Sequence, residues 1–179
     1  MVYSPCNNYL AVGSHDHTVY VIDTKTYKKI NKTKNASSSF LTGLDWSTDS
    51  SWIRTVDGSY ELLFFKVNEK EISRDPSGAS NTVETLWSDQ KCKLGWNVQG
   101  IFPPGCDGSH INSSCMTKNQ KIIASGDDWG LVCIYNNPLL EGHESNKYRG
   151  HSEHVTRVMF SDDCNYLVSI GGQDQTCIK

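Results

Sequence analysis

The chain lacks the features that would place it in a membrane or in the secretory pathway. No run approaches the roughly 18 apolar residues that a membrane-spanning helix needs. The first residues contain no charged segment followed by an apolar core, so no signal peptide is expected. The seven cysteines are odd in number and none are spaced as C-x-x-C, which predicts free thiols in a reducing compartment.

The chain also lacks a strong excess of charge of either sign. Its 179 residues are 37% hydrophobic and 21% charged, with a net charge of −3. This composition is that of an ordinary globular domain. Binding to nucleic acid regardless of sequence needs a basic surface, so nucleic acid is not an expected partner, and neither is a membrane.

No established catalytic or metal-binding motif occurs. G-x-S-x-G, the P-loop and H-E-x-x-H are all missing. His15 and His17 flank Asp16 in a turn, but no second pair of ligands is spaced convincingly for a metal. The sequence therefore predicts a protein that is not an enzyme and has no cofactor.

What the chain does contain is one pattern repeated four times. Each copy is an apolar run, a tight turn rich in Gly, Ser and Asp, and a second apolar or alternating run, which together predict a β-hairpin. The four copies span Tyr9–Asp23, Trp52–Val67, Lys121–Tyr135 and Tyr166–Ile178.

The spacing of these hairpins predicts an all-β fold, a partial β-propeller of four-stranded antiparallel sheets. Taking Asp16, Ser59, Asp128 and Asp174 as equivalent turn positions, the steps are 43, 69 and 46 residues. A period in the forties with one hairpin per unit is typical of propeller blades, and the long middle step indicates an insertion. The expected blades are residues 1–30, 36–70, 86–140 and 148–179.

Both ends of the chain fall inside a repeat in this interpretation. We expect about three and a half to four blades, cut at both ends, with the remaining blades of the same propeller as partners. An open ring would expose unpaired sheet edges, so the isolated chain is expected to be marginally stable or prone to aggregation.

One pair of residues has the spacing of a bond inside a blade. Gly150-His151 precedes Asp174 by 23 residues, and Ser161-Asp162-Asp163 between them resembles a turn. This spacing resembles that of WD-repeat proteins, and the resemblance implies that a buried His151 forms a charge-assisted hydrogen bond to the turn residue Asp174 of its own blade. The second blade has Ala36-Ser37 and Ser59 at the equivalent positions, so we expect apolar packing to hold it together instead.

Five lysines form the densest cluster of one charge. No acidic residue lies between Thr24 and Asn35, and the cluster consists of Lys25, Lys28, Lys29, Lys32 and Lys34. A solvated outer loop explains such a cluster most simply. The alternative is a basic patch for an acidic partner, whose attraction would weaken with salt.

The insertion before the third hairpin is the most distinctive stretch. It reads CKLGWNVQGIFP over Cys92–Pro103 and GCDGSHIN over Gly105–Asn112, and its close-set glycines and prolines suit sharp turns. We expect Trp96, Ile101 and Phe102 to anchor it to the core. An extra strand pair that caps the propeller is the favoured arrangement, and a ligand-binding lid is the alternative.

These residues resemble the C-terminal WD-repeat region of the echinoderm microtubule-associated protein-like family. The pattern C-x-L-G-[aromatic]-x-V-x-G-[aliphatic]-[aromatic]-P followed by D-G-x-x-I-N is similar to that family, and SSSFLTGLDWS and GGQD fit it in the same order. The resemblance covers nearly the whole chain. It implies the last four blades of the second of two joined propellers.

The resemblance also implies a function. It predicts a non-catalytic scaffold that binds tubulin or microtubules as part of a larger propeller domain, in the cytoplasm on the microtubule cytoskeleton, with the axoneme of cilia left open. No motif marks a tubulin-contacting residue. The alternative is a WD-repeat adaptor subunit of another complex, in ubiquitin ligation or trafficking.

Overall fold

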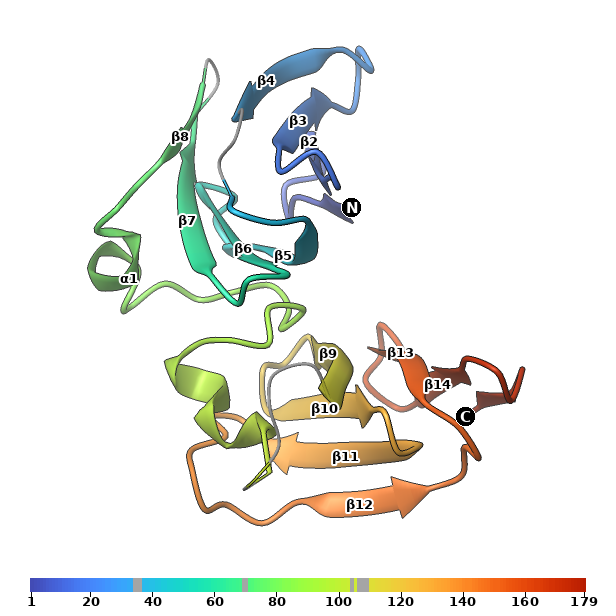
Figure 1. Cartoon of the computed structure of the whole chain (residues 1–179). Coiled ribbons are helices and arrows are strands. Elements are labelled where there is room, and N and C mark those ends of the chain that lie inside the picture. The colour runs from blue at the N-terminus through green and yellow to red at the C-terminus, as the bar shows by residue number, and fades with distance from the viewer. Residues whose placement is uncertain (34–36, 69–70, 104, 106–109) are drawn as a thin grey trace. The chain divides into compact units, whose positions relative to one another are not determined.

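The computed structural model describes residues 1–33, 37–68, 71–103, 105 and 110–179. The chain divides into two compact units, Met1–Ser88 and Asp89–Lys179. Each unit contains two antiparallel β-sheets, which Figure 1 labels by strand. None of the helices in the described part of the chain is long and apolar enough to cross a bilayer.

The first unit holds two four-stranded sheets in which each strand pairs with the next along the chain. The strands of its first sheet are β1 (Val2–Tyr3), β2 (Tyr9–Gly13), β3 (Val19–Asp23) and β4 (Lys29–Thr33). Those of its second sheet are β5 (Leu41–Trp46), β6 (Trp52–Asp57), β7 (Leu62–Val67) and β8 (Ile72–Arg74). One helical turn, α1 (Gly78–Asn81), follows.

The second unit begins with a 3₁₀ segment, η1 (Trp96–Ile101), and continues with two further sheets. The four-stranded sheet contains β9 (Ile111–Met116), β10 (Ile122–Asp127), β11 (Leu131–Asn136) and β12 (Asn146–Arg149). The three-stranded sheet contains β13 (Val155–Phe160), β14 (Leu167–Gly171) and β15 (Cys177–Ile178).

All four predicted hairpins are confirmed. They are the pairs β2–β3, β6–β7, β10–β11 and β14–β15, each in antiparallel register. The turn of each hairpin contains one residue with positive φ, namely His17, Tyr60, Gly130 and Gln175. A left-handed residue reverses the chain tightly, which explains why the sequence between the apolar runs is so short.

The turn between the first two strands of every sheet is built around one hydroxyl group. Ser4, Ser47, Thr117 and Ser161 each donate a backbone N–H to the carbonyl five residues later. The hydroxyl oxygen of each accepts the N–H of that same residue. The repeat therefore also includes a Ser or Thr in the turn between the first two strands, where its side chain forms hydrogen bonds to the backbone.

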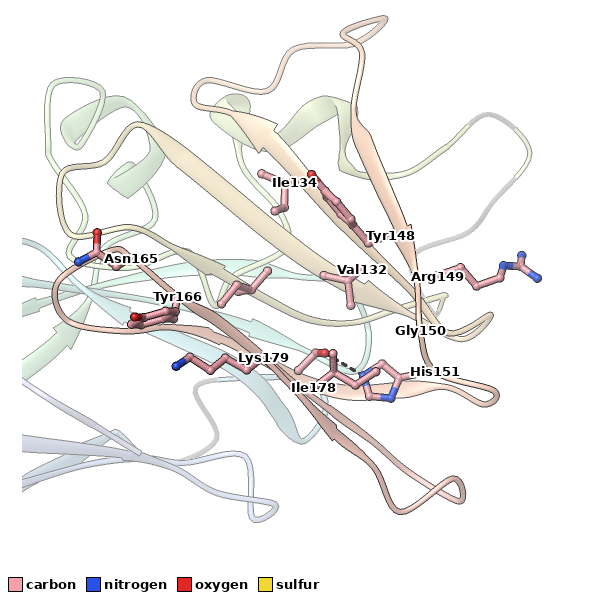
Figure 2. A pocket seen from close by; sticks show the side chains of 12 residues that line it. Val132, Ile134, Tyr148, Arg149, Gly150, His151, Asn165, Tyr166, Ile178 and Lys179 are labelled. Atoms are coloured by element: carbon pink, nitrogen blue, oxygen red, sulfur yellow. Dashed lines mark hydrogen bonds between the residues drawn. The ribbon is translucent and has the colours of Figure 1, made fainter.

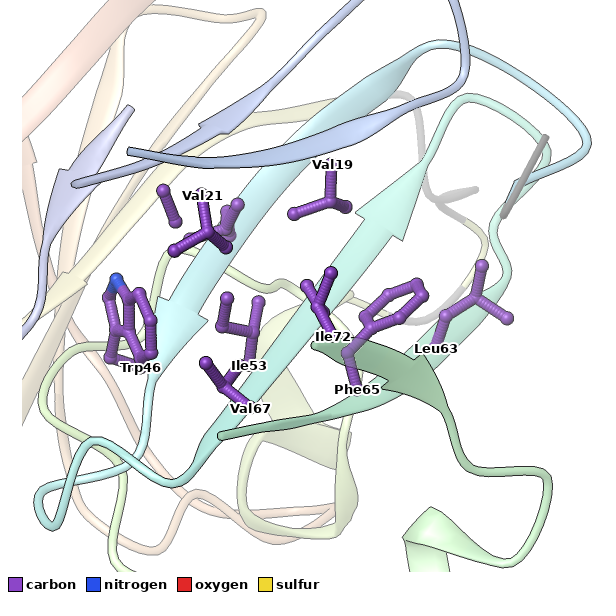
Figure 3. Packing of buried hydrophobic residues seen from close by; sticks show 10 residues of the cluster. Val19, Val21, Trp46, Ile53, Leu63, Phe65, Val67 and Ile72 are labelled. Carbon is purple, nitrogen blue, oxygen red and sulfur yellow. The ribbon is translucent and has the colours of Figure 1, made fainter. Parts of the chain in front are cut away.

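The core of the first unit lies between its two sheets. Val19 and Val21 of β3 face Trp46, Ile53 and Phe65 of the other sheet, as Figure 3 shows. The alternation of buried and half-buried residues along β3 and β7 follows the two-residue period of a strand.

The second unit has two cores. One lies under η1 and includes Val98, Ile101, Ile123 and Leu139. The other joins its two sheets through side chains such as Ala124, Val132, Val155 and Val158. Both sheets of this unit are therefore covered on at least one face by apolar packing.

The segment before β9 does not form the expected strand pair. Its described residues form the short η1 helix instead, in which Val98 and Ile101 are buried. The expectation for Trp96 was also wrong, because this side chain is 60% exposed and does not anchor the segment. Gly95, with φ of 147°, changes the chain direction into η1, which a strand could not do at this point.

Candidate functional site

The fourth sheet contains a buried polar network centred on His151. The ring Nδ1 lies 2.9 Å from Asp174 Oδ2 and 2.8 Å from Thr176 Oγ1. The ring Nε2 lies 2.8 Å from the hydroxyl of Ser169 on β14. An ionised carboxylate can only accept, so Nδ1 carries a proton and, in the neutral ring, Nε2 accepts the Ser169 hydrogen.

The charge of Asp174 is stabilised within this network. Burial raises the pKa of the Asp174 carboxyl, but hydrogen bonds from Thr176 and His151 outweigh it, and the pKa lies below its ordinary value. The Thr176 backbone N–H donates to Asp174 Oδ1 at 3.1 Å. The structure thus brings together the two residues predicted from spacing and adds Ser169 and Thr176, which the sequence analysis missed.

Ser169, His151 and Asp174 have the order of a catalytic triad, but their setting differs from that of a nucleophilic serine. Ser169 lies in β14, paired with Val158 on one side and Ile178 on the other. A nucleophile needs N–H groups directed at one developing oxyanion, which a strand paired on both edges does not provide. The arrangement suits a structural link between the segment before β13 and the turn after β14.

The second sheet has its own polar link, which corrects the expectation of apolar packing alone. The hydroxyl of Ser37 donates to Asp57 Oδ2 at 2.5 Å in a buried contact. Asp57 Oδ1 accepts the N–H groups of Ser59 and Glu61. Burial raises the pKa of the Asp57 carboxyl, but the hydrogen bonds from Ser37 and these N–H groups outweigh it, and the pKa is lowered. Ala36, the neighbouring predicted position, lies outside the described residues.

The third sheet uses the same carboxylate position. Asp127 Oδ1 accepts the N–H groups of Trp129 and Leu131 at 2.9 and 2.8 Å. Asp57 and Asp127 both end the second strand of their sheets. The turn positions chosen from the sequence, Ser59 and Asp128, lie two residues and one residue after these aspartates. The carboxylate that accepts the turn N–H groups was therefore missed in both sheets.

A buried ion pair lies deeper in the second sheet. Arg54 Nη2 lies 3.1 Å from Asp45 Oδ2, and both side chains are almost fully buried. The Arg54 guanidinium also lies 4.5 Å from the centre of the Trp87 ring. The residues beside Trp87 continue along β5, because Ser88 N donates to the Trp46 carbonyl and Thr48 N to that of Leu86. This segment covers the free edge of β5 at its end.

The lysine cluster lies on the outermost strand of the first sheet and the turn before it. Lys25, Lys28 and Lys29 are exposed, and Lys32 is half-buried. Lys29 Nζ lies 5.5 Å from the centre of the Tyr20 ring. Lys34 lies outside the described residues. Four of the five predicted lysines therefore share one sheet edge.

A cavity of about 360 Å³ opens in the second unit. Val132, Ile134 and Tyr148 line it from β11 and β12, while Tyr166 and Ile178 line it from the other sheet, as Figure 2 shows. In the first unit, Phe65, Val67 and Ile72 pack against the corresponding strand β3. The cavity thus corresponds to the space between the two sheets of the first unit, which side chains of β7 and β8 fill. Its presence therefore does not indicate a small-molecule site.

Metal-binding geometry is not found in the part of the chain that the structure describes. No three His, Cys, Asp or Glu side chains gather there in a way that could hold a metal ion. His15 stacks on Phe40, with ring centres 4.9 Å apart, and so has an aromatic neighbour. His151 is held by Asp174 and Ser169.

Comparison with known families agrees with the repeat and the fold. The model of the echinoderm microtubule-associated protein second β-propeller matches residues 1–179.

The chain belongs to this family.

Curated relatives in this family match along the whole chain. It is 46% identical to the ciliary WD repeat-containing protein ctxp80 of Euplotoides octocarinatus, over 100% of the chain and 25% of that protein. It is 38% identical to the 77 kDa echinoderm microtubule-associated protein of Lytechinus variegatus, over 99% of the chain and 27% of that protein. For the human echinoderm microtubule-associated protein-like 1 the identity is 34%, over 100% of the chain and 22% of that protein. The chain thus spans about a quarter of the length of these relatives.

A solved structure shows the same architecture. The β-propeller domain of Cps50 (Swd1) from Myceliophteria thermophila superposes with a TM-score of 0.62, covering 95% of this chain and 61% of that domain. The sequence identity is 14%, so the likeness shows the fold alone. The chain is a partial WD-repeat β-propeller built of antiparallel sheets.

The family-specific segment is a built element of the second unit. Gln90 is fully buried and donates to the Cys92 carbonyl, while Asn97 Nδ2 donates to Gln90 Oε1 at 2.7 Å. The Ser114 hydroxyl donates to the Gln90 carbonyl at 2.6 Å, which joins the segment to β9. Hydrogen bonds through Gln90 therefore hold the described start of this segment, up to Asn97, against β9.

Proposed function

We propose that this chain is part of a non-catalytic protein-interaction scaffold that binds tubulin or microtubules. The observation that carries the proposal is the family match over residues 1–179, together with relatives that are named microtubule-associated proteins. Rigid sheets joined by short turns suit such a role, because they present loops and edges in fixed positions.

Co-sedimentation of the full-length protein with taxol-stabilised microtubules tests this function. Retention in the pellet at micromolar tubulin, lost in the absence of polymer, is the expected result. A protein that stays in the supernatant but co-purifies with ubiquitin ligase or trafficking subunits would instead support the adaptor function. Incubation with generic ester and phosphate substrates checks that the Ser169–His151–Asp174 network has no hydrolytic activity.

We further propose that the basic edge, defined as Lys25, Lys28, Lys29, Lys32 and Lys34, contributes to partner binding. Lys25, Lys28 and Lys29 are exposed on one strand edge and its preceding turn. Edge lysines also protect a sheet from pairing with other strands, so their presence alone does not require a partner. An acidic partner surface would add a salt-dependent attraction to this protective role.

A charge-reversal triple variant separates these two roles. Lys25→Glu, Lys28→Glu and Lys29→Glu together should weaken microtubule binding at low salt, with a smaller difference at high salt. The matched control reverses Lys118, Lys121 and Lys147 in the second unit, which changes net charge equally. If both triples bind alike, the basic edge has only the protective role.

The proposed site of action is the microtubule cytoskeleton, including that of cilia. A relative named as a ciliary WD repeat-containing protein supports the ciliary location. We also propose residues 1–30, 36–70, 86–140 and 148–179 as successive blades. The four sheets support the number of blades, but β4, β8 and β12, the fourth strands of the first three sheets, extend beyond the proposed ends of their blades. Imaging of a tagged full-length protein in ciliated cells would distinguish axonemal from cytoplasmic microtubules.

A further inference from the structure

The side chain of Trp96 is exposed, whereas Val98 and Ile101 of the same η1 segment are buried. Trp96 is 60% exposed, whereas Val98 and Ile101 next to it are 1% and 0% exposed. An indole left in water forgoes the favourable burial of a large apolar surface. Packing inside the second unit therefore explains Val98 and Ile101 but does not explain a tryptophan at position 96.

The backbone that carries Trp96 is rigidly held. Leu139 N donates to the Asn97 carbonyl at 2.8 Å, and Gly100 N donates to the Leu139 carbonyl at 3.1 Å. A Cβ at Gly100 would lie 2.4 Å from the Leu140 carbonyl oxygen, so η1 and the loop after β11 are in close contact. A backbone that is already ordered need not be ordered on binding, which lowers the entropic cost of using Trp96 as an interface anchor.

The loop that holds η1 is acidic and partly apolar at its surface. Leu140 is partly exposed, and Glu141 and Glu144 are fully exposed. Among the described residues neither glutamate has an ion-pair partner. The lysines of the neighbouring segment are engaged, because Lys91 pairs with Asp89 and the Lys93 ammonium donates to the Ile111 carbonyl. The loop that contacts η1 therefore contributes two exposed negative charges.

We propose that Trp96, Leu140, Glu141 and Glu144 form a docking surface for a basic segment of a partner protein. An arginine or lysine of that segment stacks on the indole face, and the two glutamates complement its charge. This surface is separate from the basic edge of the first unit and selects the opposite charge, so the inference does not depend on the proposed microtubule function.

Fluorescence anisotropy with labelled model peptides tests the surface on the full-length protein. The probes are a decapeptide of alternating Arg and Gly and a Glu-Gly decapeptide of equal length. The Arg-Gly peptide should bind and the Glu-Gly peptide should not. Trp96→Ala should weaken Arg-Gly binding about fivefold or more, and E141Q with E144Q should weaken it and reduce its salt dependence.

Trp129→Ala is the matched control, because Trp129 is also an exposed tryptophan of the second unit, at 48%. It should leave the affinity for the Arg-Gly peptide unchanged. Equal affinity of Trp96→Ala and the unsubstituted protein would overturn the proposal, and so would equal binding of the acidic peptide. If Trp96→Ala fails to fold by circular dichroism, the double glutamine variant decides, since it changes only exposed side chains.

Discussion

Side-chain hydrogen bonds to an aspartate at or just after the end of the second strand link turn and strand in the second and fourth sheets. In the fourth sheet, His151 bonds to Asp174, which lies in the turn after the second strand. In the second sheet, Ser37 bonds to Asp57, the last residue of the second strand. The two bonds are equivalent: an imidazole donates to the aspartate in the fourth sheet, and a hydroxyl donates to the corresponding aspartate in the second. A buried carboxylate with no partner would be costly, which is why each sheet retains a donor.

His151→Ala should destabilise the protein. It removes the partner of the Ser169 hydroxyl, which is buried, and leaving such a group unsatisfied costs about 1–3 kcal/mol. Urea denaturation should show a lower midpoint with an unchanged slope. His143→Ala is the control, because His143 is exposed and should leave the midpoint unchanged. A midpoint equal to that of the control would contradict a structural role for His151.

Part of the residue-scale picture could be predicted from the sequence. The pairing of His151 with Asp174 could be predicted, because their 23-residue spacing resembles that of WD-repeat proteins and Asp174 lies in a recognisable turn. The Ser37–Asp57 bond could not be found the same way, since serine and aspartate are common and no Gly-His pair marks the position. The role of Ser169 could not be predicted, because a polar residue between apolar ones is what the alternating pattern of a strand predicts anyway.

At the scale of secondary structure, the geometry of the turns is more similar from sheet to sheet than that of the strands. Each hairpin turn has one residue with positive φ, and each turn before it has a hydroxyl that accepts a backbone N–H. The hairpins were predictable because two apolar runs around a Gly, Ser and Asp turn have few alternatives. The η1 segment was not, because its many turn residues are equally compatible with a strand pair.

Gly130→Ala should destabilise the β10–β11 hairpin. Gly130 has φ of +76°, and a Cβ there would lie 2.5 Å from the His151 carbonyl oxygen and 2.9 Å from that of Glu153. Backbone atoms cannot move aside cheaply, so the cost should exceed the roughly 1 kcal/mol of the left-handed conformation alone. Thermal unfolding followed by circular dichroism measures it.

Gly142→Ala supplies the control for that experiment. Gly142 has φ of +83° but nothing lies within 4 Å of the added Cβ, so this variant reports the conformational cost without a clash. Gly130→Ala should lower the melting temperature clearly more than Gly142→Ala. Equal shifts would mean that the close approach of the segment after β12 adds nothing.

Ser47→Ala should be more damaging than Ser161→Ala, although both remove the same turn hydroxyl. Ser47 is fully buried and its hydroxyl also contacts Asp49 Oδ1, whereas the corresponding bonds of Ser161 are exposed to solvent. Water can replace the lost bonds only at Ser161, so a loss of about 1–3 kcal/mol is expected at Ser47 and less at Ser161. Urea midpoints of the two variants, compared in parallel, check the order, and a reversed order would show that burial does not decide it.

At the scale of the whole molecule, the family match and the antiparallel sheets show a partial β-propeller, the architecture that the repeat period predicts. The repeat period cannot predict which surface binds a partner, because binding residues need not recur from one repeat to the next. The basic edge and the Trp96 surface illustrate this: the first was visible as a run of lysines, and the second only when the structure left one tryptophan of a buried segment in solvent.

Stability of the molecule should fall in acid, through its turn carboxylates. The pKa values of Asp49, Asp57 and Asp174 all lie below the ordinary aspartate value, because hydrogen bonds to the charged form outweigh burial, which raises them. In the unfolded chain these groups titrate near about 3.9. Above that pH their contribution is complete, and as pH falls through the lower folded values the unfolded state binds more protons, so stability is lost.

Urea unfolding between pH 3 and pH 7 measures this dependence. The free energy of unfolding should decline below about pH 4, and the decline should be shallower in Asp57→Asn, which cannot titrate and lacks one of the coupled carboxylates. Asp162→Asn, at an exposed turn aspartate outside the strand-end positions, should keep the slope of the unsubstituted protein. A slope that is the same in all three proteins would mean that the strand-end carboxylates do not couple protonation to folding, and the polar links between turns and strands would then be incidental to the stability of the propeller.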